Sequence, residues 1–545
     1  MAISLQPNEL AAKFPTLDEI PAAYRISAPL HQREILINGE LRHWGGPVRT
    51  VRSPVHVRTR DGALEAVEVG SYPVTTATES DQALDAASKA YASGTGEWPT
   101  MGVDRRISHV QDFTRRLIEK REQIVNLIMW EIGKSAADSA KEFDRTVEYI
   151  RQTIDALKEL DNNNSRFQIV EGTIAQIRRA PLGVVLCMGP YNYPLNETFT
   201  TLIPALIMGN VILFKPPKFG TLLFAPILEA FRDSFPAGVV NTVYGPGEEV
   251  VPPLMESGQV NVLALIGSSR VADKLKKLHP KTNRLRAVLG LDAKNAAIIL
   301  PDADLDLTVK ECVLGALSFN GQRCTALKTI LVHRSVADAF LAKFCAALEG
   351  LQIGMPWEKG VAITPLPDAG KPGYLSECID DAKKHGAEVR NIGGGEYCAS
   401  LYVPALVYPV NERMRLYREE QFGPIVPVVP FDNIEDALSY VESSDYGQQV
   451  SIFGTDAETI ATLVDPLVNQ VCRVNINCQC QRGPDVFPFT GRKDSAEGTL
   501  SVADALRAFS IRTMVAAKET PASKALLDDI VLGHKSAFIN TRYIF

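Results

Sequence analysis

The second third of the chain shows short apolar runs that alternate with longer amphipathic stretches. The apolar runs lie at residues 184–188, 211–214, 241–244 and 262–266, and a turn rich in glycine or proline follows each of them. Uninterrupted apolar strands that alternate with helices are typical of a parallel sheet buried between two helical layers. Ligands of such sheets bind at the carboxyl ends of the strands. The four turns are therefore the expected cofactor site.

The rest of the chain extends this α/β pattern in both directions. Apolar spacing of three and four residues predicts a long amphipathic helix over 105–131 and a second helix over 138–160. A second alternating region spans 292–493, and beyond about residue 505 the pattern predicts a strand followed by irregular chain. The other predicted strands are 35–40, 296–300, 329–332 and 450–453.

Length and composition bound the class of protein. A chain of 545 residues exceeds what one compact core holds, so two or three domains are expected. With 46% hydrophobic residues, 22% charged residues and a formal net charge of −7, the chain has the composition of a globular protein and lacks the basic character of general nucleic-acid binders. No apolar run is long enough for a membrane span, and the N-terminus lacks the pattern of a secretory signal. The nine cysteines show no metal-ligand spacing, which favours reduced thiols in the cytoplasm and no metal site.

Cys324 is the strongest candidate for a reactive group. It lies in the segment FNGQRCTA, where Gly321 permits a tight turn and Arg323 places a permanent positive charge beside the thiol. A positive neighbour lowers the pKa of a thiol, and the resulting thiolate can attack an aldehyde carbonyl. The alternative is an inert, buried cysteine, which is the commoner case.

Polar residues with possible binding roles follow the predicted strands. Asn192, held between Pro190 and Pro194, could donate a hydrogen bond to a developing oxyanion, although a turn asparagine more often bonds to its own backbone. Lys215 and Lys218 could contact a nucleotide or lie solvated at the surface. Backbone N–H groups near helix starts could bind a pyrophosphate, or belong to ordinary turns, at Gly245, Gly247, Gly267 and Ser268.

In this order and at these separations, the segments resemble the aldehyde dehydrogenase superfamily. The ordered motifs are PYNYP, KPP, G-x-G, G-S, GQRC, EEQFGP and PFTGRKxS, and the resemblance runs from about residue 35 to about residue 510. It implies an α/β aldehyde dehydrogenase fold, with a Rossmann-like cofactor domain, an α/β catalytic domain and a β oligomerisation arm. The expected parts are an N-terminal extension at 1–34, the cofactor domain at 35–165 and 183–291, an oligomerisation hairpin at 166–182, the catalytic domain at 292–493, and an oligomerisation segment and tail at 494–545.

The resemblance also implies a role for each matching residue. Cys324 matches the nucleophile, and Asn192 together with the Cys324 backbone N–H matches the oxyanion hole. The family further implies a homodimer or homotetramer, built through the hairpin and a C-terminal strand. The positions that match cofactor-binding residues are Pro190, Lys215, Lys218, Gly245, Gly247, Gly267, Ser268, Glu420 and Phe422.

One departure from the family pattern concerns the general base. The family carries a glutamate ahead of the nucleophile that activates the deacylating water, and counting back from Cys324 places Gly290 at that position. A glycine can move no proton. Asp292 and Glu497 are the nearby carboxylates that could substitute, although Asp292 could equally be a turn residue.

Within the superfamily the chain is most similar to the NADP-dependent, non-phosphorylating glyceraldehyde-3-phosphate dehydrogenases. The resemblance implies oxidation of a phosphorylated aldehyde, and guanidinium groups suit a phosphate dianion. Lys218 stands where NAD-preferring relatives often carry a glutamate, which favours NADP while leaving NAD possible. The positions that match the substrate site are Arg145, Tyr193, Arg323 and Arg482; the alternative is that these arginines form ordinary surface salt bridges.

Two other functions stay open at the level of sequence. CoA-acylating semialdehyde dehydrogenases resemble the segment around Asp292-Ala-Lys-Asn295, and a missing base would preserve a thioester until a thiol attacked it. A family member without catalysis, which only binds nucleotide or assembles as a scaffold, is the other alternative. The joint presence of Cys324, Asn192, Lys215 and Glu420 argues against it.

Overall fold

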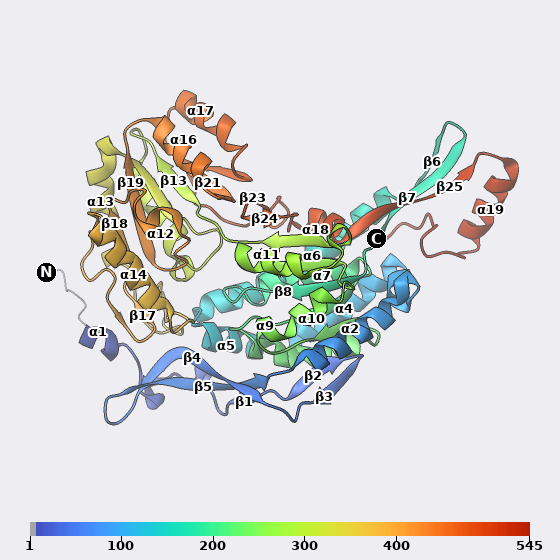
Figure 1. The fold of residues 1–545 in the computed structure, drawn as a ribbon, viewed down its shortest axis with the longest axis horizontal. Helices are drawn as coiled ribbons and strands as arrows, with labels where there is room; N and C mark the ends of the chain where they lie inside the picture. Colours follow the sequence, from blue (N-terminus) through green and yellow to red (C-terminus); the bar gives the residue numbers. More distant parts are fainter. Residues whose placement is uncertain (1–6) are drawn as a thin grey trace.

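Two parallel sheets and a projecting arm make up the fold in the computed structural model, which describes residues 7–545 (Figure 1). The first sheet has six strands in the order β10-β9-β8-β11-β12-β24, and all neighbours except β12 and β24 are parallel. The four predicted strands are confirmed as β10, β9, β8 and β11, which lie next to one another from one edge of this sheet. Their bounds, with the two further strands, are β10 (Val240–Thr242), β9 (Val211–Lys215), β8 (Val184–Met188), β11 (Val262–Ile266), β12 (Arg286–Gly290) and β24 (Ala496–Glu497).

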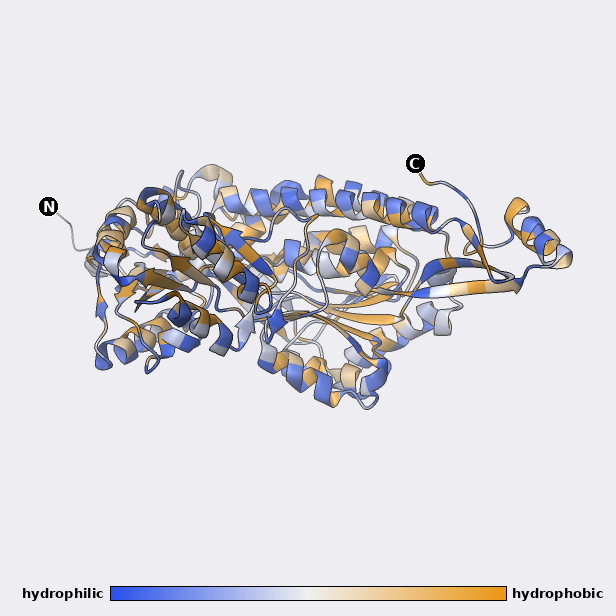
Figure 2. Cartoon of the chain, turned by 90° about the horizontal axis from the view of Figure 1, so that it is seen from above, coloured by the Kyte–Doolittle hydropathy of each residue, from blue (hydrophilic) through white to orange (hydrophobic). Residues whose placement is uncertain are grey.

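Helices cover both faces of this sheet, and its apolar strands lie as a middle layer (Figure 2). The most enclosed helix is α7 (Asn196–Ile207), all of whose residues are buried. The helix predicted over 138–160 is confirmed as α6 (Ala136–Asn163). The other helices of this half are α2 (Ala77–Tyr91), α3 (Glu97–Thr100), α8 (Leu228–Ser234), α9 (Gly247–Val250), α10 (Pro252–Glu256), α11 (Ser269–Leu278) and α18 (Val502–Ala508).

The single helix predicted over 105–131 is wrong, because the chain forms two helices there. The first, α4 (Val103–Glu119), ends where the Lys120 N–H bonds to the carbonyls of Leu117 and Ile118, and α5 (Arg121–Ile132) begins at the next residue. The first helix buries one stripe, whereas every residue from Leu127 to Ile132 of the second is buried. A straight continuation would leave that all-round apolar end in solvent, so the chain turns at Lys120 to insert it.

The second sheet has seven strands in the order β15-β18-β19-β14-β13-β21-β22. The strands predicted at 296–300, 329–332 and 450–453 are confirmed. The strand bounds are β13 (Ala296–Ile299), β14 (Thr329–His333), β15 (Glu388–Val389), β18 (Ala405–Tyr408), β19 (Ile425–Phe431), β21 (Gln449–Phe453) and β22 (Arg473–Ile476). The helices around it are α12 (Leu305–Leu317), α13 (Arg334–Glu349), α14 (Lys371–Lys384), α15 (Arg415–Arg418), α16 (Ile434–Ser443) and α17 (Ala457–Leu467).

The N-terminal segment packs along the base of both halves. Its strands pair as β1 (Leu30–His31) with β5 (Leu64–Pro73) and β5 with β4 (Val48–Arg58), beside the hairpin of β2 (Glu34–Ile37) and β3 (Glu40–His43). Helix α1 (Pro7–Ala12) precedes them. Leu10 and Phe14 are fully buried, so this part of the expected extension belongs to the core. Within residues 7–545, no helix has both the length and the apolar character of a membrane span.

A three-stranded arm projects from the first sheet. The hairpin expected at 166–182 is present as β6 (Phe167–Val170) and β7 (Thr173–Pro181), and β25 (Ser510–Lys518) pairs antiparallel along β7. The irregular chain predicted after this last strand is wrong, because α19 (Pro521–Leu532) follows it. Thr520 caps this helix through its side chain, and Pro521 occupies its first turn, where a proline is compatible with a helix.

Candidate active site

Cys324 follows a sharply bent segment between α12 and β14. Phe319, Asn320 and Gly321 all have positive φ, of 48°, 56° and 70°. The Asn320 side chain fixes this bend, because its amide donates to the Thr364 carbonyl at 2.9 Å and its oxygen accepts from the Thr364 N–H at 2.9 Å. The bend brings the thiol to the wall of a cavity of about 860 Å³. The nucleophile segment is thus held rigidly at a ligand-sized hollow.

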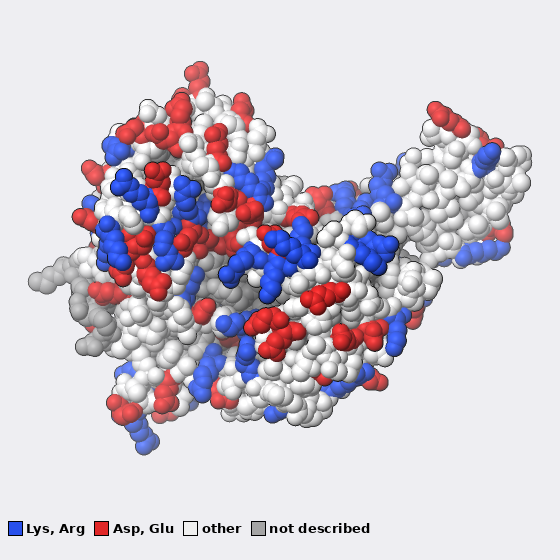
Figure 3. Space-filling model, in the orientation of Figure 1, with Lys and Arg blue, Asp and Glu red and all other residues white. Residues whose placement is uncertain are grey.

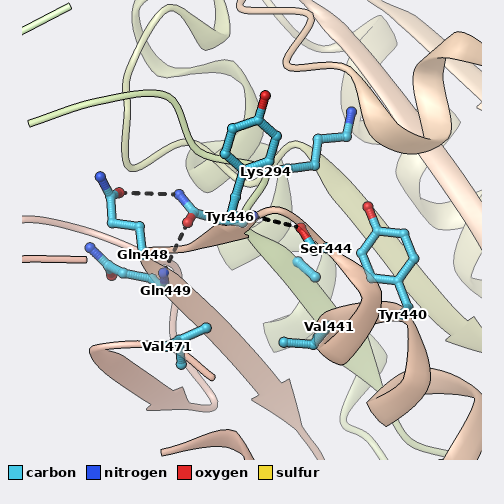
Figure 4. A pocket seen from close by; sticks show the side chains of 10 residues that line it. Lys294, Tyr440, Val441, Ser444, Tyr446, Gln448, Gln449 and Val471 are labelled. Carbon is cyan, nitrogen blue, oxygen red and sulfur yellow. Dashed lines mark hydrogen bonds between the residues drawn. The ribbon is translucent and has the colours of Figure 1, made fainter. Parts of the chain in front are cut away.

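The backbone of the nucleophile is anchored from behind. The Cys324 carbonyl accepts hydrogen bonds from Asn295 Nδ2 at 2.8 Å and from Lys328 Nζ at 2.9 Å. Asn295 also reaches Gln448 and Gln449, beside a small pocket that Lys294 and Tyr446 help to line (Figure 4). That pocket measures about 10 Å³, which is room for no more than one water. It is part of the support of the nucleophile rather than a ligand site.

The resting thiol is less acidic than the sequence predicted. Burial raises the pKa of Cys324, and the charge of Glu197 raises it further, against the opposing effects of Lys328 and Arg482. Arg323 was expected to lower this pKa. Its guanidinium instead turns to the carbonyl of Gly315 at 2.9 Å, so its charge is directed away from the sulfur.

All four residues of the predicted substrate site line the cavity with Cys324: Arg145, Tyr193, Arg323 and Arg482. Two of the arginines are already ion-paired. Arg145 holds Asp485 through two hydrogen bonds of 2.9 and 2.7 Å. Arg482 pairs with Glu197 and lies 3.3 Å from Asp485, and it also donates to the Leu500 carbonyl. The salt-bridge alternative therefore describes Arg482 well, while Arg145 keeps an unused Nη1.

Asn192 lies against the nucleophile segment as predicted. Its Nδ2 donates to the carbonyl of Gln322 at 2.8 Å, two residues before the thiol. The Tyr191 hydroxyl reaches the Gln322 side chain at 3.2 Å. Because the amide is buried beside the thiol, it can turn a donor to an oxygen that develops there.

A buried ion pair holds the Asn192 loop. Lys134 and Glu142 are both fully enclosed and lie 2.5 Å apart. Lys134 Nζ also donates to the Asn192 carbonyl at 2.7 Å and lies over the Tyr193 ring. Glu142 Oε1 accepts from the N–H groups that start α7, at 3.0 Å from Leu195. The loop is thus clamped at both ends by one charged pair.

A second cavity, of about 830 Å³, collects residues of the predicted cofactor site. Lys215, Lys218, Gly245 and Gly247 all line it. Burial lowers the pKa of Lys215 to about 8, with a raising effect from Glu248 and a lowering one from Arg49. A nucleotide with negative charge fits this surface, because it would compensate a desolvated ammonium.

Arg49 of β4 lines the same cavity and was missed by the sequence analysis. It stands in a strand far from every motif, and nothing in its local sequence marks it. With Arg52, Lys215 and Lys218 it makes four cationic side chains around this hollow.

The remaining predicted cofactor residues lie at the same edge of the first sheet or facing it. Gly267 and Ser268 follow β11, and Pro190 follows β8, the strand beside it. Glu420 pairs with Lys328 at 2.8 Å, and the rings of Phe422 and Tyr191 lie 5.9 Å apart. Burial raises the pKa of Glu420, although Lys328 opposes this.

The two carboxylates considered as replacements for the missing base are committed elsewhere. Asp292 accepts from the Ser269 N–H at 2.8 Å and so caps the start of α11. Glu497 pairs with Lys276 at the surface, 2.6 Å away. Neither lines the cavity of Cys324. Gly290 ends β12, and a Cβ placed on it would lie 3.3 Å from Leu500 Cδ1.

Glu197, by contrast, does line that cavity and was missed. In the sequence it reads as an acidic residue in the first turn of an apolar helix, where a glutamate complements the helix dipole and needs no other explanation. Among residues 7–545, no group of three or more His, Cys, Asp or Glu side chains is placed to bind a metal ion.

An α/β fold with a buried thiol at one cavity and a cationic groove at the edge of its first sheet is the arrangement of an NAD(P)-dependent dehydrogenase. The family model of the aldehyde dehydrogenase family matches residues 56–515. The chain belongs to the aldehyde dehydrogenase family.

Within the family, the chain is similar to several individual proteins that share one name. The chain is 34% identical to an NADP-dependent glyceraldehyde-3-phosphate dehydrogenase of Streptococcus equinus, over 83% of this chain and 93% of the relative. Identity to the protein of that name from Pisum sativum is 30%, over 78% and 85%. The crystal structure of the NADP-dependent glyceraldehyde-3-phosphate dehydrogenase of Bacillus halodurans C-125, complexed with NADP, superposes with a TM-score of 0.81 at 31% identity, over 90% of this chain and all of that one.

The clamp on the Asn192 loop can be tested with Glu142→Gln. The substitution leaves Lys134 buried without a counter-charge, so we expect the free energy of unfolding to fall by about 3–5 kcal/mol in denaturant titrations. Glu148→Gln, at an exposed position of the same helix, is the control and should change it by less than about 0.5 kcal/mol. Equal stability of the two variants would contradict the clamp.

The raised pKa of Cys324 predicts slow alkylation near neutral pH. A thiol whose pKa lies above 9 is less than half ionised at pH 9, so its reaction with iodoacetamide should still accelerate beyond that pH. The measurement is peptide-resolved mass spectrometry of the cofactor-free protein across pH, with N-acetylcysteine as reference. A rate at Cys324 that levels off below pH 8 would mean that the thiol is activated at rest.

Proposed function

We propose that this aldehyde dehydrogenase oxidises glyceraldehyde 3-phosphate to 3-phosphoglycerate with NADP, through a thioester on Cys324. The observation that carries the proposal is one cavity lined by the thiol, by Tyr193 and by Arg145, Arg323 and Arg482. The relatives that bear the name NADP-dependent glyceraldehyde-3-phosphate dehydrogenase support this choice of substrate and cofactor.

The hydrogen bonds of the arginines indicate which of them contacts the phosphate. Arg482 uses all three guanidinium nitrogens, on Glu197, Asp485 and the Leu500 carbonyl. Arg145 and Arg323 each have Nη1 free of partners among residues 7–545. Arg145 and Arg323 are therefore the phosphate contacts, and Arg482 positions the carboxylates between them.

The chemistry follows from the groups around the sulfur. The Cys324 thiolate adds to the aldehyde carbon, and the oxyanion that forms accepts hydrogen bonds from Asn192 Nδ2 and the Cys324 N–H. NADP, when bound, supplies the acceptor for the hydride. Asn295 and Lys328 keep the nucleophile in place throughout, because both hold its carbonyl. Water then cleaves the thioester.

The cationic groove supports NADP over NAD. Lys215, Lys218 and Arg49 surround one hollow at the ends of β9 and β4, and a 2′-phosphate is a dianion that pairs with such groups. The expected domain division gives Arg49, Lys215 and Lys218 to the cofactor domain (35–165 and 183–291) and the thiol to the catalytic domain (292–493).

CoA acylation is the second candidate, because Gly290 removes the family base and a relative named malonate-semialdehyde dehydrogenase, from Listeria innocua, is 28% identical over 78% of this chain. It differs from the first candidate in the acceptor of the acyl group. CoA would be consumed, and a thioester product would appear in place of 3-phosphoglycerate.

The proposal is tested by following NADPH formation from glyceraldehyde 3-phosphate, with and without CoA, and by identifying the product. We expect 3-phosphoglycerate in the absence of CoA and of inorganic phosphate, and no activity in Cys324→Ala, which lacks the nucleophile. Turnover that requires CoA would favour the second candidate. A wild-type protein as silent as Cys324→Ala with this substrate and a panel of aldehydes would indicate a family member without catalysis.

We further propose that the enzyme acts in the cytoplasm as a homodimer or homotetramer joined through the arm. All nine cysteines are free thiols, which persist in the cytoplasm. The arm exposes large apolar side chains, and its face in Figure 3 carries charge mainly at the edges. These exposed side chains are Ile169, Val170, Ile511, Met514, Leu526 and Leu532. Burying them against a second copy removes apolar surface from water.

The assembly through the arm predicts that Val170→Glu with Met514→Glu yields monomers. Two buried carboxylates at an apolar interface lack partners, so association should weaken by more than a hundredfold. Size-exclusion chromatography with light scattering measures the mass. Lys518→Ser, at an exposed polar position of β25, is the matched control. A double variant with the mass of the wild type would exclude the arm as the interface.

A further inference from the structure

The place that the family gives to its general base is occupied by apolar side chains in this chain. Gly290 offers no carboxylate, and the space beside it is filled by Leu500 and Ile266, at 3.3 and 3.5 Å from a Cβ built on the glycine. The two carboxylates nearby, Asp292 in the same segment and Glu497 on the neighbouring strand β24, bind Ser269 and Lys276 instead. A base that serves the thioester must therefore come from another wall of the cavity.

Glu197 supplies a carboxylate at that wall. It lies in the first turn of α7, is only 6% exposed, and lines the cavity with Cys324. Its ion pair with Arg482 gives the buried carboxylate a counter-charge. Arg482 is in turn fixed by Asp485 and the Leu500 carbonyl.

One oxygen of this carboxylate is open. Arg482 bonds to Oε2, whereas Oε1 accepts no hydrogen bond from residues 7–545. It is also not among the enclosed side-chain atoms without a partner, so it opens to the cavity. A carboxylate with one oxygen anchored and one free can orient a water molecule.

The charge of Glu197 affects the pKa of the Cys324 thiol. After burial, the charge of Glu197 is the strongest influence on the pKa of the Cys324 thiol, ahead of Lys328, Arg482 and Glu420. Asp138, a carboxylate on the same cavity, instead accepts a hydrogen bond from the Ser135 hydroxyl. Glu197 therefore combines an open oxygen at the cavity with an electrostatic effect on the reacting atom.

We propose that Glu197 is the general base that activates the deacylating water, in place of the glutamate that Gly290 replaces. The assignment rests on the proposed thioester chemistry. Oε1 takes one proton from a water molecule as its oxygen forms a bond to the thioester carbonyl carbon. The tetrahedral adduct collapses, the carbon–sulfur bond breaks, and the electron pair leaves on the Cys324 sulfur. The proton on Glu197 then passes to this thiolate, which restores the resting thiol and carboxylate.

The decisive measurement is the hydrolysis of a preformed acyl-enzyme. The full-length protein is acetylated with p-nitrophenyl acetate, desalted, and followed by intact mass spectrometry as the acetyl group is lost; Cys324→Ala defines acetylation elsewhere. We expect Glu197→Gln to acquire the acetyl group as the wild type does and to lose it about 100-fold more slowly or worse. Hydroxylamine, which needs no base to attack a thioester, should release the acetyl group at equal rates from both proteins.

Controls separate catalysis from structure. Asp138→Asn removes a carboxylate from the same cavity and should deacylate as the wild type does. Equal deacylation rates of Glu197→Gln and wild type would overturn the assignment, and so would a failure of Glu197→Gln to become acetylated.

This test uses neither NADP nor glyceraldehyde 3-phosphate. A wild type that is inactive with that aldehyde but hydrolyses its acetyl-enzyme through Glu197 would refute the proposed substrate and leave the base assigned. Turnover of glyceraldehyde 3-phosphate, together with equal deacylation rates in Glu197→Gln and wild type, would support the proposed substrate and refute Glu197 as the base.

Discussion

The enclosed pair of Lys134 and Glu142 is the interaction on which the catalytic half of the cavity depends. The two side chains connect the start of α6 to the loop that carries Asn192 and to the first N–H groups of α7. A charge pair without access to water persists only if each partner is well coordinated, and here the backbone of the loop supplies the further bonds. The positions of Asn192, and of Glu197 in the first turn of α7, are therefore set by electrostatics inside the core.

Around the sulfur, the charges are arranged so that almost every one has an opposite partner. Arg145 and Arg482 share Asp485, Arg482 also holds Glu197, and Lys328 holds Glu420. Within this network, burial and the charge of Glu197 raise the pKa of the Cys324 thiol, against the opposing effects of Lys328 and Arg482, and so favour its protonated form. The reactivity of the Cys324 thiol then depends on how bound substrate and cofactor change these charge pairs.

Much of the fold could be predicted from the sequence, and the reasons are local. The strands at 184–188 and 262–266 are uninterrupted apolar runs, and a turn follows each of them. The hydrophobic pattern and the turn residues therefore predict the same strand and the same end. The break at Lys120 could not be predicted, because the apolar residues of α4 and α5 follow one continuous helical spacing. The chain turns there because α5 is buried more deeply in the core than α4. The motif residues were found because they lie in contiguous strings. Arg49 and Glu197 were missed because their meaning arises from elements distant in the chain that meet at one cavity.

The position of Arg49 has a consequence for how the charge of the second cavity can change. This arginine lies near the start of β4, ahead of residues 56–515 that the family model matches, yet it lines the same hollow as Lys215. A substitution at this position would alter the charge of the hollow and leave the strands of the first sheet unchanged. A comparison of such proteins restricted to residues 56–515 would overlook that change.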